Sequence, residues 1–242
     1  MRQFINAFFL LALTQLFPLL FTNAAKAEES TPQLPSITTP SPQKVSTQPS
    51  DSVTKVVAAK LMTNFPDGNF YPEKLITRGE LASILVKAFQ LDKRQAASKG
   101  ADITPPADVS PGHSAFNDIQ TVLKTGIMKG YRNNLFFPNQ RINRAEALAI
   151  FAQAYGVFQF GDDTVNEILA PHPDAASIPG WARKAIATIV TEGFINTDTQ
   201  GNLFPLQPMT RGDMALVLSK FLQREQRLPE TPVVPDIPNT SK

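Results

Sequence analysis

The chain has 242 residues, of which 42% are hydrophobic, and it carries a formal net charge of +2 at pH 7. This is enough apolar material for a packed core of ordinary size. The sequence contains no cysteine, which excludes disulfides, and its two histidines, His113 and His172, have no second histidine at helical spacing. We therefore expect no metal site and no cofactor. A charge this close to neutrality gives no support for nucleic acid as a partner.

Residues 1–27 have the features of a secretory signal peptide. Arg2 gives a positive start, residues 8–21 are mostly apolar, and small residues precede a predicted cleavage before Glu28. An uncleaved membrane anchor is the alternative, but the apolar run is short and interrupted. Cleavage would remove Arg2 and Lys26 and no acidic residue, which takes the formal net charge from +2 to zero. We expect an exported protein of the periplasm, cell surface or envelope, without stable membrane insertion after signal cleavage.

Two Pro-rich segments flank the expected core. Residues 28–50 are rich in Ser, Thr, Pro and Gln, and in residues 228–242 prolines recur at every third position from Pro229 to Pro238. Neither segment can bury enough apolar surface to order itself, so both are predicted to be disordered. A polar connector, 92–106, is predicted within the core.

A pattern of proline, arginine and acid occurs three times. The arginine follows the proline by six residues in each copy, and successive arginines lie 66 and 67 residues apart. Such periodicity indicates a repeat architecture. We predict a mainly α chain of three tandem helix–loop–helix units: repeat 1 (51–92), repeat 2 (105–160) and repeat 3 (171–227). The copies read Pro72…Thr77-Arg78-Gly79-Glu80, Pro138…Asn143-Arg144-Ala145-Glu146 and Pro205…Thr210-Arg211-Gly212-Asp213.

Each repeat contains two stretches with the apolar spacing of one helix face. We interpret these faces as a shared core. Between the two helices, a residue that tolerates a left-handed backbone occupies the same place in each repeat: Gly68, Asn134 and Gly201. The first helices are indicated by residues 53–61, 119–127 and 186–194, and the second by residues 81–89, 147–155 and 214–222.

A good helix-capping residue precedes each second helix, and an acid stands three positions later. The capping side chain can accept a backbone N–H of the first turn, while the acid reaches back to the N–H of the capping residue. This predicts a capping box in each repeat, in which the aspartate of repeat 3 is a shorter variant. The pairs are Thr77 with Glu80, Asn143 with Glu146, and Thr210 with Asp213.

The arginine of each motif is harder to explain by helix propensity. It falls in the first helical turn, where the helix dipole disfavours a cation. One interpretation is a fixed anionic or polyhydroxyl partner, since a planar set of donors beside free helix N–H groups suits a carboxylate. The other is an internal salt bridge to an acid of the next repeat, such as Asp108 or Asp174. The residues alone leave both open.

Taken together, these motifs resemble the S-layer homology (SLH) domain, over nearly all of the chain between the two spacers. Repeat 2 has an Asp-x-x-x-Gly-His-Ser-Ala stretch at 108–115 and Gly126-Ile127-Met128-Lys129-Gly130-Tyr131 before its motif. Repeat 3 has Asp174, Gly180-Trp181-Ala182 and Gly193-Phe194 in the corresponding places. Repeat 1 matches through Asp67-Gly68-Asn69-Phe70, Pro72 and its motif.

The resemblance implies a pseudo-threefold arrangement of the repeats with grooves between neighbours. Such grooves bind cell-wall-linked polysaccharides, often acidic or pyruvylated, and hold proteins at the bacterial envelope. The motif arginines Arg78, Arg144 and Arg211 are then the expected ligand contacts. Trp181 matches an aromatic of the family that could stack on a sugar ring, although a place in the core is an equal alternative.

The repeats depart from the family pattern in different ways. Ser114 stands where repeat 3 has Trp181. Repeat 1 is degenerate at its N-terminal side, because Gln48 and Pro42 of the spacer occupy the places of Ser114 and Asp108. The three grooves are therefore not expected to bind equally.

Three functions compete. The resemblance favours a non-catalytic envelope protein that binds a peptidoglycan-linked polymer. The second is a structural scaffold or partner-recruiting module without glycan binding, with other envelope proteins as partners. The third is a glycan hydrolase, which needs paired carboxylates. Asp67 and the pair Asp162-Asp163 are the available acids, and we interpret them as turn residues, so no catalytic residue is predicted.

Overall fold

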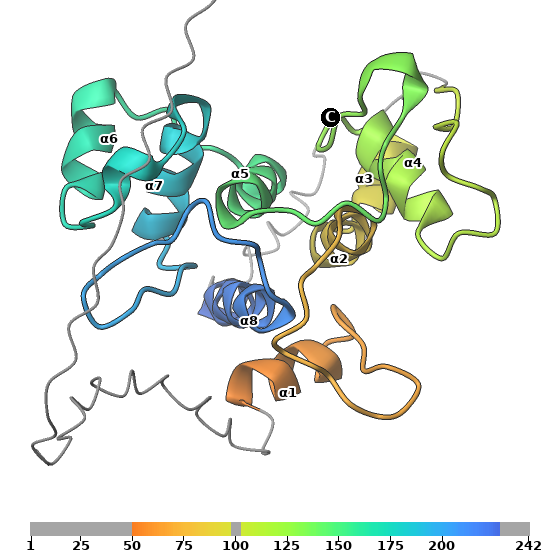
Figure 1. The fold of residues 1–242 in the computed structure, drawn as a ribbon, viewed down its shortest axis with the longest axis horizontal. Helices are drawn as coiled ribbons and strands as arrows, with labels where there is room; N and C mark the ends of the chain where they lie inside the picture. The colour runs from red at the N-terminus through yellow and green to blue at the C-terminus, as the bar shows by residue number, and fades with distance from the viewer. Residues whose placement is uncertain (1–49, 98–102, 228–242) are drawn as a thin grey trace, which may run out of the picture. The chain divides into compact units, whose positions relative to one another are not determined.

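A computed structural model describes residues 50–97 and 103–227 (Figure 1). The predicted signal peptide and both Pro-rich spacers lie outside these residues, except for Ser50. Within them the fold is helical, with isolated β-bridges in place of a sheet. The α-helices are α1 (Asp51–Ala58), α2 (Arg78–Phe89), α3 (Leu91–Ala97), α4 (Phe116–Lys124), α5 (Arg144–Tyr155), α6 (Asp162–Leu169), α7 (Arg183–Thr191) and α8 (Arg211–Arg227); short 3₁₀ helices are η1 (Arg132–Asn134), η2 (Ala175–Ser177) and η3 (Gly180–Ala182).

The predicted helix pairs are confirmed. The first helices are α1, α4 and α7, and the second are α2, α5 and α8, which all begin at the motif arginine. Thr77, Asn143 and Thr210 cap the second helices by accepting the N–H three residues later at 3.2, 2.8 and 3.0 Å. The left-handed backbone is also confirmed, at φ 84°, 55° and 89° for Gly68, Asn134 and Gly201.

The prediction of three capping boxes is correct for two repeats only. Glu146 and Asp213 each reach back to the N–H of the capping residue, at 3.3 Å in both cases. Glu80 does not, and its carboxylate pairs with Arg211 of repeat 3. An ion pair alone does not exclude the capping box, because Asp213 pairs with Arg144 through Oδ1 and accepts the N–H of Thr210 through Oδ2.

Each first helix packs on the second helix of another repeat. Helix α4 packs on α2, α7 packs on α5, and α1 packs on α8. The third contact joins the first helix of the described chain to the last one. Figure 1 shows α2, α5 and α8 nearly end-on in the middle, each beside its partner helix. The three repeats therefore close on one another in the expected pseudo-threefold order.

Aromatic rings join the three second helices at the centre of the core. Phe89 of α2 lies 5.1 Å from both Phe151 of α5 and Phe221 of α8, measured between ring centroids. Phe194, which follows α7, contacts Phe151 and Phe221 at 6.1 Å in each case. Edge-on and tilted aromatic pairs at these distances add to the free energy of burial.

Two segments differ from the sequence-based expectation. The predicted polar connector begins as helix α3, whose Leu91 is buried. Asp162 and Asp163, which we expected in a loop turn, instead begin helix α6. Acids are favoured there by the helix dipole, and Val165 and Leu169, four positions apart, form the buried face that indicates this helix.

Replacing Phe151 with Ala should lower the free energy of unfolding by about 3–5 kcal/mol, because the ring is fully buried among three other aromatic rings. Urea denaturation followed by circular dichroism measures this. Leu206→Ala is the control, since that side chain is 61% exposed, and a change within about 0.5 kcal/mol is expected. Equal stabilities of the two variants would contradict a shared central core.

Candidate functional site

The start of each second helix binds the Pro-containing loop of another repeat. We call each of these contacts a junction and number it by the two repeats that it joins. At junction 1/2, the N–H groups of Arg78 and Gly79 donate to the carbonyls of Gln140 and Pro138, at 2.9 and 2.8 Å. The same pair of bonds recurs at junction 2/3, with Gln207 and Pro205 as acceptors, and at junction 3/1, with Lys74 and Pro72. We expected the N–H groups at the start of each second helix to be free to bind a carboxylate, and this expectation is wrong. The neighbouring loop satisfies the orphan donors of the helix end.

Each motif arginine is buried in its junction and reinforces these bonds. The exposed fractions are 7%, 4% and 5% for Arg78, Arg144 and Arg211. In every case Nε donates to a loop carbonyl at 2.9 Å, and Nη2 donates to a second carbonyl nearer the first helix. The carbonyls belong to Phe136 and Lys129 for Arg78, to Leu203 and Asn196 for Arg144, and to Phe70 and Thr63 for Arg211.

The third guanidinium nitrogen, Nη1, distinguishes the junctions. In Arg144 it forms an ion pair with Asp213 at 2.9 Å, and in Arg211 it pairs with Glu80. Arg78 makes no ion pair with any described residue. The internal salt bridge that the sequence left open thus exists at two junctions, where the partners are the helix-capping acids.

Asp108 and Asp174, the acids suggested from the sequence for this pairing, have another role. Both oxygens of Asp108 accept the N–H groups of Phe136 and Phe137, at 2.8 and 2.7 Å. Asp174 holds the loop of repeat 3 in the same way, at 2.9 and 2.7 Å. These carboxylates brace the loops, since each accepts two converging backbone N–H groups.

Aromatic rings line two of the junctions. The guanidinium carbon of Arg78 lies 4.8 and 4.7 Å from the ring centroids of Tyr131 and Phe136. That of Arg211 lies 4.8 and 4.4 Å from Phe65 and Phe70. Such stacking offsets part of the cost of burying the charge.

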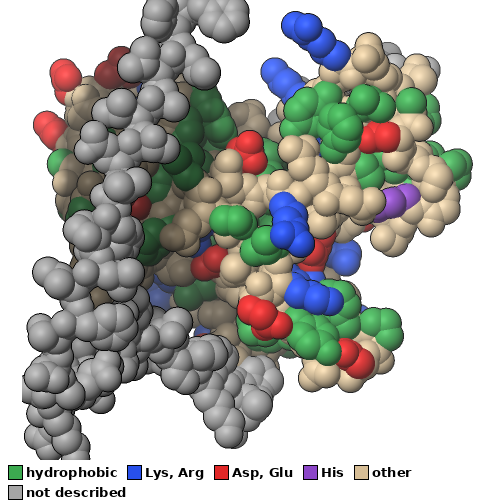
Figure 2. All heavy atoms as spheres, in the orientation of Figure 1, with side chains coloured by type: hydrophobic (Ala, Val, Ile, Leu, Met, Phe, Trp, Pro, Cys, Tyr) green, Lys and Arg blue, Asp and Glu red, His purple; other side chains and the backbone are tan. Residues whose placement is uncertain are grey.

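A pocket of about 550 Å³ opens beside junction 1/2. Two exposed rings form its apolar part, Tyr131 (46% exposed) and Phe137 (43%), with centroids 5.1 Å apart. Phe137 has a positive φ of 55°, which is uncommon for an aromatic residue. Figure 2 shows hydrophobic side chains at the surface with Lys and Arg side chains next to them. The other lining residues are Asp108, Pro138, Asn139 and Gln140.

Trp181 lies in η3, before α7, and is 65% exposed. The alternative that placed this ring in the core is therefore wrong. The exposed indole ring can therefore stack on a ligand.

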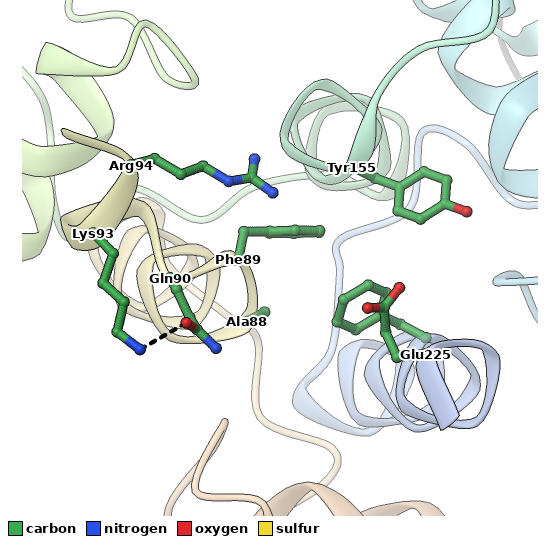
Figure 3. A pocket seen from close by; sticks show the side chains of 8 residues that line it. Ala88, Phe89, Gln90, Lys93, Arg94, Tyr155 and Glu225 are labelled. Carbon is green, nitrogen blue, oxygen red and sulfur yellow. Dashed lines mark hydrogen bonds between the residues drawn. The ribbon is translucent and has the colours of Figure 1, made fainter. Parts of the chain in front are cut away.

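A second pocket, of about 380 Å³, lies at the C-terminal ends of the second helices (Figure 3). Arg94 of α3 extends above Phe89 and donates to the carbonyl of Ala154 at 3.3 Å. Glu225 is the single carboxylate among the residues that line this pocket. The described residues that line this pocket therefore do not include the two facing carboxylates that glycoside hydrolysis requires. Within residues 50–97 and 103–227 no helix is long and apolar enough to cross a bilayer.

Burial and local hydrogen bonds shift the pKa values of charged groups at the junctions. Burial lowers the pKa of Arg78, although the charges of Tyr131, Glu146 and Asp108 oppose this. Burial also raises the pKa of Glu80, and the attraction of Arg211 does not fully compensate. For Asp213, burial acts upward, but hydrogen bonds from Thr210 and Asn196 and the charge of Arg144 outweigh it and hold the pKa below the ordinary 3.8.

Comparison with known families identifies the family to which these three repeats belong. The model of the S-layer homology domain matches residues 45–82, 107–148 and 173–215, one match in each repeat. The chain belongs to the S-layer homology domain family. The matches include all three motif arginines and the loops that they bind.

Characterised relatives share this region as a small part of longer proteins. The chain is 28% identical to the surface-layer 125 kDa protein of Lysinibacillus sphaericus, over 77% of this chain and 15% of that protein. It is 30% identical to a cellulosome-anchoring protein of Acetivibrio thermocellus, over 69% of this chain and 36% of that protein. An endoglucanase of a Bacillus species is 25% identical over 67% of this chain and 16% of the enzyme.

The ion pair of Arg144 should make stability depend on pH through Asp213. Because the folded-state pKa lies below 3.8, the carboxylate stabilises the fold at pH values above this, and the contribution is lost as pH falls through the folded-state pKa. Asp213→Asn should therefore lower the free energy of unfolding by about 1.5–3 kcal/mol at neutral pH.

The difference in the free energy of unfolding between wild type and D213N, measured by urea denaturation, should become smaller below pH 3.8. Asp163→Asn, at an exposed position of α6, controls for the loss of one charge and should change stability by less than about 0.5 kcal/mol. A gap between wild type and D213N that stays constant down to pH 2 would contradict the assignment.

Proposed function

We propose that this chain is a non-catalytic protein of the bacterial cell envelope that binds a cell-wall-linked polysaccharide non-covalently at its inter-repeat junctions. The observation that carries the proposal is the buried Arg78, which forms no ion pair with any described residue, beside a pocket with exposed aromatic rings. Aromatic faces suit the C–H surface of a sugar ring, and a guanidinium suits an acidic substituent. A pyruvylated or otherwise acidic polymer combines both features.

The relatives support attachment to the cell wall over catalysis. Two of these relatives are named for a surface layer and for cellulosome anchoring. The endoglucanase shares only 16% of its length with this chain, so its name does not describe the shared part. The family and the relatives therefore point to a binding module of a kind that other proteins combine with different domains.

Export and the choice of partners are part of the proposal. The sequence of residues 1–27 supports secretion, and the periplasm or the cell surface then brings the chain into contact with the wall. Other envelope proteins are further candidate partners. The alternative is a scaffold whose junctions hold the repeats together without a glycan, and the internal ion pairs at junctions 2/3 and 3/1 favour this reading for those two places.

Sedimentation with insoluble cell-wall sacculi tests the proposal. The protein without residues 1–27 should sediment with sacculi that retain their linked polymer. It should stay in solution with sacculi from which hydrofluoric acid has removed phosphodiester-linked polymer. High salt should weaken retention, because charged contacts contribute to it.

Equal amounts of protein in the pellet with intact and stripped sacculi would mean that the linked polymer is not the ligand. No sedimentation with either preparation would favour the scaffold. Reducing-sugar release from the same sacculi measures catalysis, and turnover there would contradict a purely binding role.

A further inference from the structure

The pocket at the C-terminal ends of the second helices lies at the opposite end of those helices from the junctions. Its lining residues belong to α2, α3, α5 and α8 and to the residue that joins α2 to α3. Figure 3 shows Lys93 and Arg94 on one side of the pocket and Glu225 on the other. The junctions use the first turns of the second helices. What this pocket binds is therefore a separate question from what the junctions bind.

The α3 side of the pocket is cationic. Lys93 and Arg94 are both exposed. Nζ of Lys93 donates to the side-chain oxygen of Gln90 at 2.8 Å, and Nη1 of Arg94 donates to the carbonyl of Ala154 at 3.3 Å. Both acceptors are neutral, and neither cation forms an ion pair with a residue that the structure describes. This side therefore offers two cations to an anionic occupant.

Aromatic rings from three helices also line the pocket. Phe89 of α2 and Phe221 of α8 are each only 6% exposed, whereas Tyr155 of α5 is half-buried and supplies more of the accessible ring surface. The ring centroids of Tyr155 and Phe221 lie 6.3 Å apart. Grooves lined by aromatic rings bind polyproline II segments, because such a segment is already extended and loses little conformational entropy on binding.

The chain that follows α8 has a sequence suited to such a pocket. It leaves the described part of the chain at Arg227, two positions after Glu225 of the pocket wall. Prolines then stand at every third position in residues 229–238, which is the period of a polyproline II helix. On that helix Glu230 and Asp236 share a second face, two turns apart. At about 3.1 Å per residue this segment spans about 28 Å, which is ample to cross a pocket of this size.

Charge favours one placement of the acids of this segment. Glu225 stands on the α8 side of the pocket, where the segment begins, and it repels carboxylates. Lys93 and Arg94 stand on the α3 side and attract them. A segment that crosses from α8 to α3 therefore moves its acids from a repelling side to an attracting one.

We propose that residues 229–238 bind in this pocket of their own chain as a polyproline II segment. Glu230 and Asp236 face Lys93 and Arg94, and the prolines pack against Tyr155. The segment has too little apolar surface to order itself, so it gains its order from the pocket. The Pro-rich segment is then an internal ligand of the repeats, held at the opposite end of the second helices from the junctions.

A spin label on the segment tests this contact. The chain has no native cysteine that would also take the label, so a nitroxide can be attached through Val234→Cys in the protein without residues 1–27. The backbone amide signals are then followed by nuclear magnetic resonance. The signals of Ala88, Gln90 and Tyr155, which line the pocket, should be strongly broadened.

Charge reversal distinguishes a bound segment from one that is only tethered nearby. Lys93→Glu combined with Arg94→Glu should lower the broadening about fivefold, the effect of losing two partly exposed ion pairs. Changing Glu230 and Asp236 to Lys in that background should restore it. Lys87→Glu is the control and should leave the broadening unchanged, because this exposed lysine of α2 does not line the pocket. Circular dichroism checks that each variant is folded.

Equal broadening in wild type and in the K93E/R94E variant would overturn the proposal. A mixture of nitroxide-labelled chains at natural isotope abundance and unlabelled ¹⁵N chains tests for binding between copies. Broadening of the same size in this mixture would assign the pocket to the segment of a second copy and overturn binding within one chain. Sedimentation with sacculi should be equal for wild type and K93E/R94E, so failure of this proposal and failure of the wall-binding function are distinguishable.

Discussion

The fold depends on one repeated interaction, the bond between the first turn of each second helix and the loop of the next repeat. Two backbone N–H groups reach two loop carbonyls, and the motif arginine adds two further bonds through Nε and Nη2. Helix ends normally leave such donors unsatisfied. Here the loop of another repeat satisfies them, so the residues that begin each helix also hold the three units together.

The buried arginines set the chemistry of the junctions. A guanidinium removed from water needs acceptors, a counter-charge or aromatic faces, because an unpaired charge is costly in the interior. All three arginines have carbonyl acceptors, but among the residues that the structure describes only Arg144 and Arg211 have an ion-pair partner. The same backbone bonds therefore surround two arginines that are ion-paired and one for which the described residues supply no ion-pair partner. Repetition of the motif does not imply the same charge environment around each copy.

The sequence predicts the local part of this structure well. Periodic apolar residues place the helix pairs, Thr77, Asn143 and Thr210 mark the caps, and Gly68, Asn134 and Gly201 mark the left-handed positions. Capping and turn conformation depend on residues only a few positions apart, which explains this success. The α6 helix could also have been found, since its buried Val165 and Leu169 have helical spacing.

The partners of the motif residues could not be predicted in the same way. Arg211 binds Phe70 and Thr63, which precede it by 141 and 148 residues. The spacing of the motifs shows that the chain contains three equivalent repeats, but it does not show which repeat supplies the loop that each motif arginine binds. The loop carbonyls that occupy the helix N–H groups, and the pairing of Arg144 with Asp213 in place of Asp174, both follow from that order.

The packing of α1 on α8 also limits how such a chain can change in evolution. Open arrays of repeats gain or lose units easily, because a new unit only extends one end. Here the last unit is already joined to the first, so an added fourth unit would have to break an existing contact to enter. Substitutions within the three units leave this closure intact, so their surfaces can diverge without breaking a contact between repeats.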